Sequence, residues 1–482
     1  MSTRVFRRIA VIALGALTLT HCAQNPVTGD KDFVLMSGQQ EIQMGAQAHQ
    51  DVLKEYAALD NPALQAYVDE VGQRLAKQSH RPELTWHFTV VDSPDVNAFA
   101  LPGGYVYISR GILAYLNSEA ELAGVVGHEI GHVTARHGVR QQSTSTVVGL
   151  GAALGSVLVP GLNNQAGASL LQTLAQAWTA GYGREHELES DRLGAQYLAK
   201  AGYNPQAMIE VIGVLKNQEL FAAEQARRDG RKPGTYHGTF DTHPSNDARL
   251  QQAVGEANKY TVEHPREGRS DYLHRMAGIH FGDSPDQGVI RNNALLHGKL
   301  GLAIQFPPGW AVKNRPDRVT AISPQGDALV ELQQGPRHDK PLETLQKLKL
   351  DAGARYDSGS LGGYPAAFAA GAQQGKPVVA AAVAFNGTLY LIAGMAKDKP
   401  TYDRERNTLR AAINSFHAIT AAEKQAARPY VLHVTTAQPG TTMAALARQS
   451  PLGATAESQL RLINGLYPRG EPKPGQLLKI VQ

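Results

Sequence analysis

The clearest periodic pattern of apolar residues predicts a helix from Ser118 to about His137. Ser118 and Glu121 have the spacing of a capping box, in which each side chain satisfies a backbone N–H at a helix start. Apolar residues then recur at i, i+3, i+4 and i+8, which is one face of a helix: Leu122, Val125, Val126 and Ile130. We expect this face to be buried in a helical core.

Two earlier helices show the same kind of start signal. Ser37 and Gln40 cap a predicted helix that runs to about Leu59. Asn61 is the predicted N-cap of the next helix, and Pro62 takes its first position. That second helix carries an apolar face: Leu64, Tyr67, Val68, Val71 and Leu75. Both helices are expected to bury the back of the helix that starts at Ser118.

Alternating apolar and polar residues predict two strands, Trp86–Val91 and Tyr105–Ser109. The segment 97–104 between them, Asn-Ala-Phe-Ala-Leu-Pro-Gly-Gly, contains the residues that permit a sharp return. We therefore expect a small sheet whose edge lies in this part of the chain.

After Tyr272 the pattern changes to short strands, at 302–306, 319–323, 329–332, 378–385 and 389–393. Asn386-Gly387 joins the last two and is a strong signal for a type I′ hairpin turn. Helices are predicted at 342–354 and 402–416. We expect an antiparallel α+β domain over residues 285–420, with some likeness to PsbP-type folds. It lacks a second cluster of catalytic residue types, so a binding or spacer role is expected.

The last segment, 428–482, resembles a LysM module, a βααβ unit that binds the N-acetylglucosamine chains of peptidoglycan. The resemblance rests on four short stretches: 430–434, 438–442, 460–466 and 474–481. Thr441 stands where such modules have an aspartate, and the segment between the helices is long. A unit that caps the rest of the chain or recognises protein is therefore the alternative to glycan binding.

Composition limits the class of protein. A chain of 482 residues is too long for one core and should hold two or three domains. The 47 basic and 43 acidic residues nearly balance, so neither a nucleic-acid surface nor an acidic tail is implied. The single cysteine excludes an intramolecular disulfide.

The N-terminus carries a targeting signal. Basic residues precede an apolar run, Ile9–Thr20, that is too short to span a bilayer, and Cys22 follows. Residues 1–21 resemble a bacterial lipoprotein signal peptide, which implies cleavage before Cys22 and acylation of its thiol. His21 departs from the small residue usual there, which leaves an ordinary signal peptide or an uncleaved anchor open. Ala23 suits sorting to the outer membrane, and residues 24–35 read as a polar tether.

The predicted helix at Ser118 carries the chain's clearest chemistry, His128-Glu129-Ile130-Gly131-His132. Histidines four apart stand on one helical face, so both imidazoles can bind one ion. In this HExxH arrangement Zn²⁺ lowers the pKa of a water, and the glutamate takes its proton. The alternative is a structural helix that happens to hold two histidines.

The third metal ligand must come from elsewhere in the chain. A metzincin would have a histidine six residues after His132, but Gly138 stands there. His137 falls half a helical rotation from His128 and is expected to point away from the metal. In the stretch 183–195, Glu187 and Asp191 share a helical face. Spacing alone leaves Glu185 and Glu189 open as ligands.

Four segments in order resemble the HtpX/BepA/CAAX-endopeptidase family of zinc metalloproteases, of the gluzincin type: 97–104, 128–137, 184–195 and 242–245. The resemblance covers about residues 25–255 and implies a protease domain at 22–270. It implies one Zn²⁺ per chain, held by His128, His132 and Glu187. Glu129 would be the general base, and Asp191 would hold the free N–H of a ligating histidine.

The resemblance also suggests roles for two further residues. Asn97 would bond to substrate backbone or to the polarised carbonyl; the alternative is a turn residue. His243 would lie near the zinc, either stabilising the oxyanion or binding as an inhibitory fourth ligand. The alternative for His243 is a helix start, since Pro244 suits the first helical position.

No catalytic role is predicted for two further segments. Residues 147–162 are apolar and glycine-rich but fall short of a membrane span, so a hairpin or loop over the cleft is expected. Residues 216–232 predict a surface helix and loop, a possible lid. The remaining histidines, His137 and His186 among them, are expected to be ordinary surface or core residues.

The sequence thus predicts an α+β multidomain protein with a mainly helical, zincin-like protease domain. We expect a zinc metalloendopeptidase in the periplasm, anchored to the outer membrane, that degrades misfolded or stalled envelope proteins. Its expected partners are such substrates and peptidoglycan, but no nucleic acid. Two alternatives stay open: a non-enzymatic, chaperone-like envelope factor, and a zinc amidase that acts on peptidoglycan cross-links. The intact ligand and base set disfavours the first, and the extended-chain segment 97–104 disfavours the second.

Overall fold

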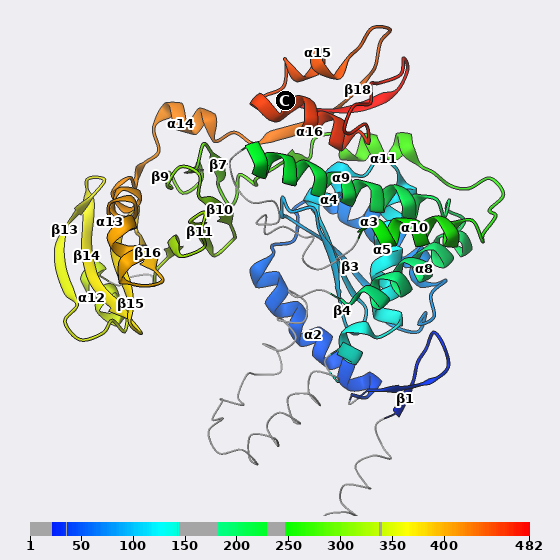
Figure 1. The fold of residues 1–482 in the computed structure, drawn as a ribbon, viewed down its shortest axis with the longest axis horizontal. Coiled ribbons are helices and arrows are strands. Elements are labelled where there is room, and N and C mark those ends of the chain that lie inside the picture. Colours follow the sequence, from blue (N-terminus) through cyan, green and yellow to red (C-terminus); the bar gives the residue numbers. More distant parts are fainter. Residues whose placement is uncertain (1–21, 35, 142, 144–181, 229–245, 337–339) are drawn as a thin grey trace, which may run out of the picture.

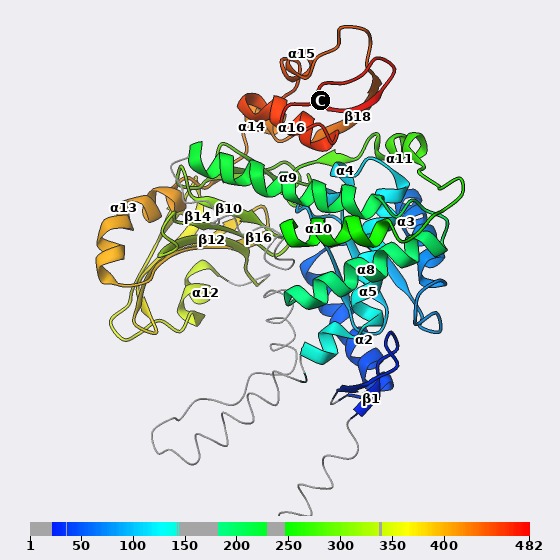
Figure 2. The same ribbon diagram turned by 45° about the vertical axis from the view of Figure 1, so that its right-hand side comes forward.

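The computed structural model describes residues 22–34, 36–141, 143, 182–228, 246–336 and 340–482. A helical region and a sheet-rich region lie side by side, and a small C-terminal unit lies over the helical region (Figure 1 and Figure 2). This mixture of a helical and a sheet-rich part confirms the predicted α+β class. Among the described helices, none is long and apolar enough to cross a membrane.

The helical region contains the three helices that were predicted from their caps. Its described helices are α2 (Gly38–Glu55), α3 (Pro62–Ala76), α4 (Arg110–Tyr115), α5 (Glu119–Thr134), α8 (Arg184–Lys200), α9 (Ala207–Arg228), α10 (Asn246–Ala257) and α11 (Arg269–Met276). Every residue of α5 is buried, so the helix with the two histidines lies at the centre of this region.

Side-chain caps explain where α2 and α3 begin. Ser37 Oγ accepts from the Gln40 backbone N–H, and the Gln40 side chain accepts from the Ser37 N–H, which completes the predicted capping box. Asn61 Oδ1 accepts from the Leu64 N–H at 3.1 Å, with Pro62 in the first position of α3. The predicted end of the first helix was too late, because α2 ends at Glu55.

The helix α5 differs from its prediction at both ends. Ser118 Oγ accepts from the Glu121 N–H as expected, but the Glu121 carboxylate accepts from the Asn117 N–H rather than from Ser118. The helix ends at Thr134, three residues before the predicted end. Arg136 has a φ of 56°, a left-handed conformation that turns the chain out of the helix.

A three-stranded sheet lies beside α5, in the order β3 (His87–Val91), β5 (Tyr105–Ser109) and β4 (Ala98–Leu101). The strands β3 and β5 run parallel, and β4 is antiparallel to β5. The segment predicted as a return therefore forms the edge strand itself. Its turn is made by Gly103 and Gly104, whose φ values of 84° and 102° favour glycine.

The prediction of a polar tether is wrong for the described residues of this stretch. Strand β1 (Cys22–Gln24) pairs with β2 (Lys31–Phe33), and Asn25 organises the turn between them. Its Oδ1 accepts from the Val27 N–H at 2.8 Å, and its Nδ2 donates to Asp32. The segment is therefore an ordered hairpin. Residues 1–21 lie outside the described ones, so the signal peptide and the acylation of Cys22 stay predictions.

The sheet-rich region is built on a seven-stranded antiparallel sheet in the order β10-β11-β12-β16-β15-β14-β13. Its strands are β10 (Ala311–Asn314), β11 (Arg318–Ile322), β12 (Ala328–Gln334), β13 (Arg355–Leu361), β14 (Tyr364–Gln373), β15 (Lys376–Phe385) and β16 (Thr388–Ala396). The predicted hairpin turn is present, because Phe385 pairs with Thr388 and both Asn386 and Gly387 have positive φ.

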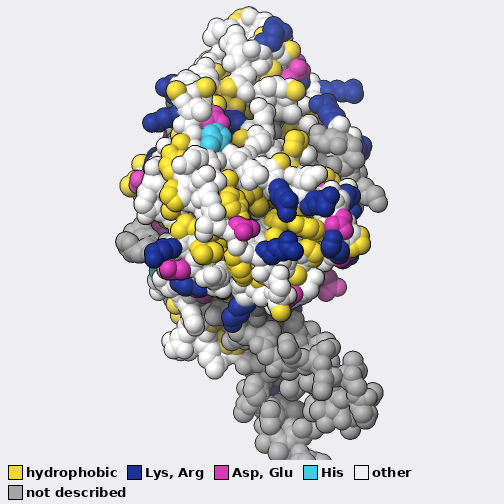
Figure 3. All heavy atoms as spheres, turned by 90° about the vertical axis from the view of Figure 1, so that its left-hand side faces the viewer, with side chains coloured by type: hydrophobic (Ala, Val, Ile, Leu, Met, Phe, Trp, Pro, Cys, Tyr) yellow, Lys and Arg dark blue, Asp and Glu magenta, His cyan; other side chains and the backbone are white. Residues whose placement is uncertain are grey.

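Two helices cover opposite faces of this sheet. Alternate side chains of β15 pack with α13 (Lys399–Asn414) and with α12 (Pro341–Lys347). The helix α12 is shorter than predicted; beyond its end, Asp351 accepts hydrogen bonds from the backbone N–H groups of Gln374 and Gly375. On the outer face of this region, hydrophobic side chains gather across the centre beside Lys and Arg (Figure 3).

A smaller sheet joins this region to the end of the chain. Its order is β17 (His417–Ala418), β9 (Leu302–Gln305), β8 (Ala294–His297) and β7 (Val289–Arg291). The short helix α14 (Ala421–Ala426) then leads into the C-terminal unit.

The C-terminal unit has the predicted strand–helix–helix–strand order: β18 (Tyr430–Thr436), α15 (Met443–Ala447), α16 (Ala456–Ile463) and β19 (Leu477–Val481). Its identity as a LysM module stays a prediction. Strand β18 pairs with β19 and also with β6 (His280–Phe281) of the helical part of the chain. The fully buried Lys479 donates from Nζ to the Ala114 and Leu116 carbonyls at the end of α4, and burial lowers its pKa to about 7.

Some predictions fall outside the described residues. They concern the apolar segment 147–162, His243 with its neighbours 242–245, and residues 229–232 of the possible lid. The helical part of that lid prediction is confirmed, since residues 216–228 form the end of α9.

Candidate metal centre

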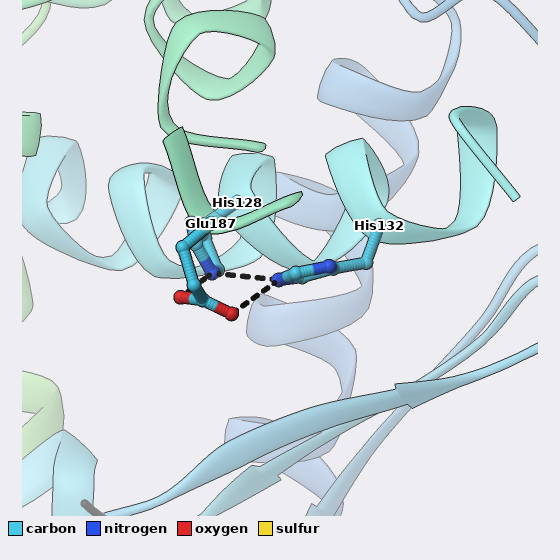
Figure 4. Close-up of side chains that lie close together, drawn as sticks. All are labelled: His128, His132 and Glu187. Atoms are coloured by element: carbon cyan, nitrogen blue, oxygen red, sulfur yellow. Dashed lines mark hydrogen bonds and ion pairs between the residues drawn. The ribbon is translucent and has the colours of Figure 1, made fainter. Parts of the chain in front are cut away.

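Three side chains from two helices converge on one point. His128 and His132 come from successive turns of α5, and Glu187 comes from the first turn of α8 (Figure 4). The two Nε2 atoms lie 3.0 Å apart, and the Glu187 oxygens lie 3.6 Å from His128 Nε2 and 3.4 Å from His132 Nε2. All three side chains are buried. The structure thus brings together the three residues predicted to bind the metal.

Small residues let α5 and α8 approach closely enough for this convergence. A Cβ built on Gly131 would lie 2.6 Å from Ser190 Oγ, and one on Gly194 would lie 3.2 Å from the His128 backbone nitrogen. Ser190 also donates a hydrogen bond to the His128 carbonyl. A larger side chain at Gly131 would push the helices apart and carry Glu187 away from the histidines.

The orientation of His128 is fixed by Asp191, as predicted from the spacing on α8. His128 Nδ1 lies 2.8 Å from Asp191 Oδ1. Burial alone would raise the pKa of Asp191, but Arg249 and His128 outweigh it and lower the pKa. The ionised carboxylate can only accept, so Nδ1 carries the proton and Nε2 presents its lone pair to the centre.

Arg249, from α10, was missed by the sequence analysis. It donates to both oxygens of Asp191 at 2.7 Å, and its Nη1 lies 3.1 Å from Glu187 Oε2. The side chain is buried, so one guanidinium neutralises two buried carboxylates. Its position, six residues after His243 and just beyond the segment 242–245, was the one signal that the sequence offered.

His132 is oriented by a second chain of hydrogen bonds, and this corrects the expectation that His137 points away from the metal. His132 Nδ1 lies 2.8 Å from His137 Nδ1, and His137 Nε2 lies 3.0 Å from Glu189 Oε2. The bond from His137 lowers the pKa of Glu189 to about 2, and burial lowers the pKa of His137. The ionised Glu189 accepts from His137, His137 accepts from His132, and His132 Nε2 faces the centre as a lone pair.

The early end of α5 explains why the prediction for His137 was wrong. Because α5 stops at Thr134 and Arg136 reverses the chain, His137 folds back against His132 instead of continuing round the helix. His186 then stacks on His137, with ring centroids 4.3 Å apart. Tyr182 stacks on His132 at 4.1 Å. Neither ring was expected beside the centre.

Glu129 and Asn97 lie on one side of the centre. Both line a pocket with His128 and Arg249. The side chain of Glu129 is 2% exposed, and Asn97 Oδ1 is buried without a hydrogen-bond partner. The predicted base therefore lies beside His128, and Asn97, the predicted substrate-binding residue, lines the same pocket.

The donor set fits a divalent transition metal. Two neutral imidazole nitrogens and one carboxylate oxygen lie within 4.8 Å of one another, and each imidazole has its other nitrogen engaged. This combination suits zinc in an open catalytic site. In the described part of the chain, His128, His132 and Glu187 form the one such cluster.

Comparison with known proteins decides the family of this region. Residues 62–257 match the sequence model of Peptidase family M48. The chain carries an M48 metalloprotease domain. The beta-barrel assembly-enhancing proteases of Yersinia pestis and Escherichia coli (strain K12) are 32% and 34% identical to it, over 58% and 46% of this chain. The mitochondrial metalloendopeptidase OMA1 of Arabidopsis thaliana is 31% identical over 42% of the chain.

The chain matches only part of the length of each of these relatives. The matches span 59%, 44% and 38% of the three relatives' lengths. Among solved structures, cyanobacterial PsbP from Synechocystis sp. PCC 6803 has a TM-score of 0.21 and 15% identity, covering 29% of this chain and 98% of its own. At that score the likeness to PsbP-type folds stays a prediction.

Proposed function

We propose that the protein is a zinc-dependent metalloendopeptidase, in which His128, His132 and Glu187 hold one Zn²⁺. The observation that carries this proposal is the paired orientation of the two imidazoles. Asp191 accepts the Nδ1–H of His128, and His137 accepts the Nδ1–H of His132. Both Nε2 lone pairs are therefore directed at Glu187. The two Nε2 atoms lie 3.0 Å apart and each lies within 3.6 Å of a Glu187 oxygen, so one cation can bind all three side chains.

When bound, zinc polarises the scissile carbonyl and lowers the pKa of the attacking water. The remaining steps belong to the chain's own residues. Glu129, buried beside the histidines, takes the proton of the water and gives it to the leaving amine. Asn97 accepts a hydrogen bond from a substrate backbone N–H at its unpartnered Oδ1, which holds the peptide across the centre.

The edge strand β4 supports an extended polypeptide as substrate. Among the described strands, β4 pairs only with β5, so its other edge can accept a peptide as an added strand. β4 also runs from the Glu129 side of the centre to the His132 side, because the pockets on those two sides contain its first and its last residues. A peptide paired with β4 would therefore pass the metal in extended form.

The substrates we propose are misfolded or stalled envelope proteins, above all outer-membrane β-barrel proteins. This rests on similarity to relatives described as beta-barrel assembly-enhancing proteases. We further propose a periplasmic location with an outer-membrane anchor at lipidated Cys22, and contact with peptidoglycan through the C-terminal unit. His243 remains our proposal for an oxyanion stabiliser or an inhibitory fourth ligand.

The test is hydrolysis of an unfolded outer-membrane β-barrel protein by the zinc-loaded full chain. We expect wild type to cleave it, and Glu129→Gln to lose about 10²–10⁴-fold in rate, the usual contribution of a general base. The matched control Glu263→Gln alters an exposed carboxylate and should leave the rate unchanged. Cleavage that persists in Glu129→Gln would overturn the assignment. Cleavage of peptidoglycan cross-links instead would favour the amidase.

A further inference from the structure

The chain just after the N-terminal hairpin of β1 and β2 packs against the segment that follows α5. Val34, behind β2, and Met44, on α2, form a buried apolar cluster with Val139. Arg136 donates from Nη2 to the Met36 carbonyl at 3.1 Å, so polar and apolar contacts join the same two segments. The start of the described chain is therefore fixed to the segment behind the metal-binding helix.

Arg140 joins the hairpin itself to the polar contacts behind the metal centre. Its Nε lies 3.5 Å from Asp32 Oδ2 on β2, and its Nη1 donates to Glu189 Oε2 at 3.3 Å. The same Glu189 oxygen lies 3.0 Å from His137 Nε2, and His137 accepts from His132. A path of polar contacts thus runs from β2 to one of the proposed zinc ligands.

The hairpin holds the acidic end of this path in place. Asp32 Oδ2 also accepts from Asn25 Nδ2 at 2.8 Å, and Asn25 organises the hairpin turn. The side chains of Asp32 and Glu189 are only 17% and 20% exposed. Solvent and salt therefore screen these two ion pairs of Arg140 less than they screen a pair on the open surface.

The carboxylate of Glu189 needs Arg140 in order to stay beside His137. Both donors bind Oε2, while Arg192 lies 3.9 Å from Oε1 on the other side of the carboxylate. Without Arg140, Oε2 can turn toward water or toward Arg192. His137 then loses the acceptor that fixes its tautomer, and His132 is no longer obliged to present a lone pair at Nε2.

We infer that the N-terminal hairpin is a positioning element of the metal centre, and that it acts through Arg140 on the imidazole of His132. Arg140 and Asp32 are positioning residues, which act on the metal through other side chains. The inference rests on the proposed zinc peptidase and adds a means of regulation, because docking of the hairpin and binding of zinc stabilise each other. Strand β1 begins at Cys22, the proposed acylation site, so a change at the anchored end that undocks the hairpin lowers the affinity for zinc.

The first test measures the zinc affinity of the full chain by competition with a chromophoric chelator. Arg140→Met should weaken zinc binding by about 5–10-fold, the lower part of the range for coupled sites, and Asp32→Asn should weaken it in the same direction. Arg140→Lys keeps the charge and should recover part of the loss. The control Arg404→Met breaks an exposed ion pair with Asp327 and should bind zinc like wild type. A loss in Arg140→Met without one in Asp32→Asn would overturn the role of the hairpin.

A double substitution separates positioning from a general loss of stability. If Arg140 acts through His137, its effect disappears once His137 is gone. The zinc affinity of the double variant Arg140→Met/His137→Ala should therefore equal that of His137→Ala within about 2-fold, the usual error of additivity. Independent effects that add in the double variant would show that Arg140 acts by another route, and would overturn the inference.

The coupling is also visible from the side of the hairpin. Zinc added to metal-free Glu129→Gln should slow amide hydrogen exchange in β1 and β2 by about 5–10-fold, and should leave strand β16 unchanged. The same experiment in an Arg140→Met background should show no such protection; equal protection there would overturn the inference.

These measurements separate the positioning role from the proposed function, because none of them depends on cleavage. A protein that shows the coupling to zinc but hydrolyses no polypeptide would support the hairpin's role and refute the peptidase. A wild type that binds no zinc would refute both.

Discussion

At the scale of single residues, each imidazole of the centre is oriented by a different partner. His128 donates to a carboxylate that a buried arginine holds ionised, while His132 donates to a neutral histidine that in turn donates to Glu189. An imidazole fixed at Nδ1 needs no reorientation to bind a metal through Nε2. His137 is therefore as much a part of the centre as Asp191.

Replacing His137 tests this relay. We expect His137→Ala to weaken zinc binding by about 10–100-fold, the usual effect of losing such a partner. Competition with a chromophoric chelator measures the affinity without reference to catalysis. His264→Ala, at an exposed histidine, is the control and should bind zinc like wild type. An unchanged affinity in His137→Ala would show that the relay does not orient His132.

Arg249 supports a second residue-scale prediction. Its removal in Arg249→Met leaves Asp191 and Glu187 charged, buried and close together. We expect a loss of about 3–5 kcal/mol in the free energy of unfolding of the metal-free protein, measured by urea titration. Arg228→Met breaks an exposed pair with Glu224 and should change stability by less than about 0.5 kcal/mol. Equal effects of the two substitutions would contradict this role.

At the scale of elements, the start of α5 is held by one carboxylate. Glu119 in its first turn accepts hydrogen bonds from Tyr203 at 2.8 Å, Tyr67 at 3.1 Å and Arg74 at 3.1 Å. Burial alone would raise its pKa, but the bonds from Tyr203, Arg266 and Tyr67 outweigh it and lower the pKa below 4.5. The carboxylate also suits the positive end of the helix dipole.

This arrangement predicts a pH dependence of stability. A carboxyl whose folded pKa is lowered stabilises the fold above its usual pKa of 4.5 and loses that contribution as the pH falls through the lowered value. Glu119→Gln should therefore be less stable than wild type at pH 7 by about 1.5–3 kcal/mol. The difference should shrink progressively below pH 4.5. Thermal unfolding across this range measures it.

The exposed Glu70, which pairs with Arg74, provides the control. Glu70→Gln should show a small difference at every pH, because its side chain is 68% exposed. A Glu119→Gln difference that stays constant down to acid pH would mean that the charge of Glu119 does not stabilise the fold.

Elements with local signals were predictable from the sequence. The caps at Ser37, Asn61 and Ser118 and the turn at Asn386-Gly387 act over two to four residues, and all four are found. The end of α5 was not predictable, because an arginine at positive φ gives no sequence signal. Strand β14 was also missed: its run of alanines has weak strand propensity, and its pairing with β13 and β15 supplies the stability instead.

At the scale of the whole molecule, the two largest apolar clusters of the described residues are separate from each other. Apolar residues of the C-terminal unit, such as Leu460 and Ile463, belong to the same cluster as the helices of the M48 domain. The sheet-rich region has its own clusters, which include Ile413 and Phe416. Burial of α16 against the helical region makes that unit part of its fold, although it lies at the far end of the sequence.

Calorimetry of the full chain should therefore show two transitions. Ile463→Ala removes a buried side chain of the C-terminal unit, and Ile413→Ala removes one of the sheet-rich region; each should cost about 2–5 kcal/mol. Ile463→Ala should lower only the transition of the M48 domain, and Ile413→Ala only the other. A separate third transition for the C-terminal unit would contradict the shared core.

The sequence could predict the parts of this assembly better than their arrangement. The order of strands and helices in 428–482 follows from local patterns, but the contact of Lys479 with the end of α4 joins residues more than 360 positions apart. Likewise, the sequence could place the third metal ligand only within one short helical stretch. The choice among Glu185, Glu187 and Glu189 depends on how α8 packs on α5. In the structure, Glu187 is buried at the centre, Glu189 bonds to His137, and Glu185 is exposed.

The difference between the buried Glu187 and the exposed Glu185 provides the most direct test of the metal centre. Elemental analysis of dialysed protein should find one zinc per chain in wild type and in Glu185→Gln, whose exposed carboxylate lies on the same helix. Glu187→Gln should lose the zinc, because a neutral amide replaces the one charged ligand. Wild type without stoichiometric zinc, or Glu187→Gln that retains it fully, would contradict the centre on which the proposed hydrolysis depends.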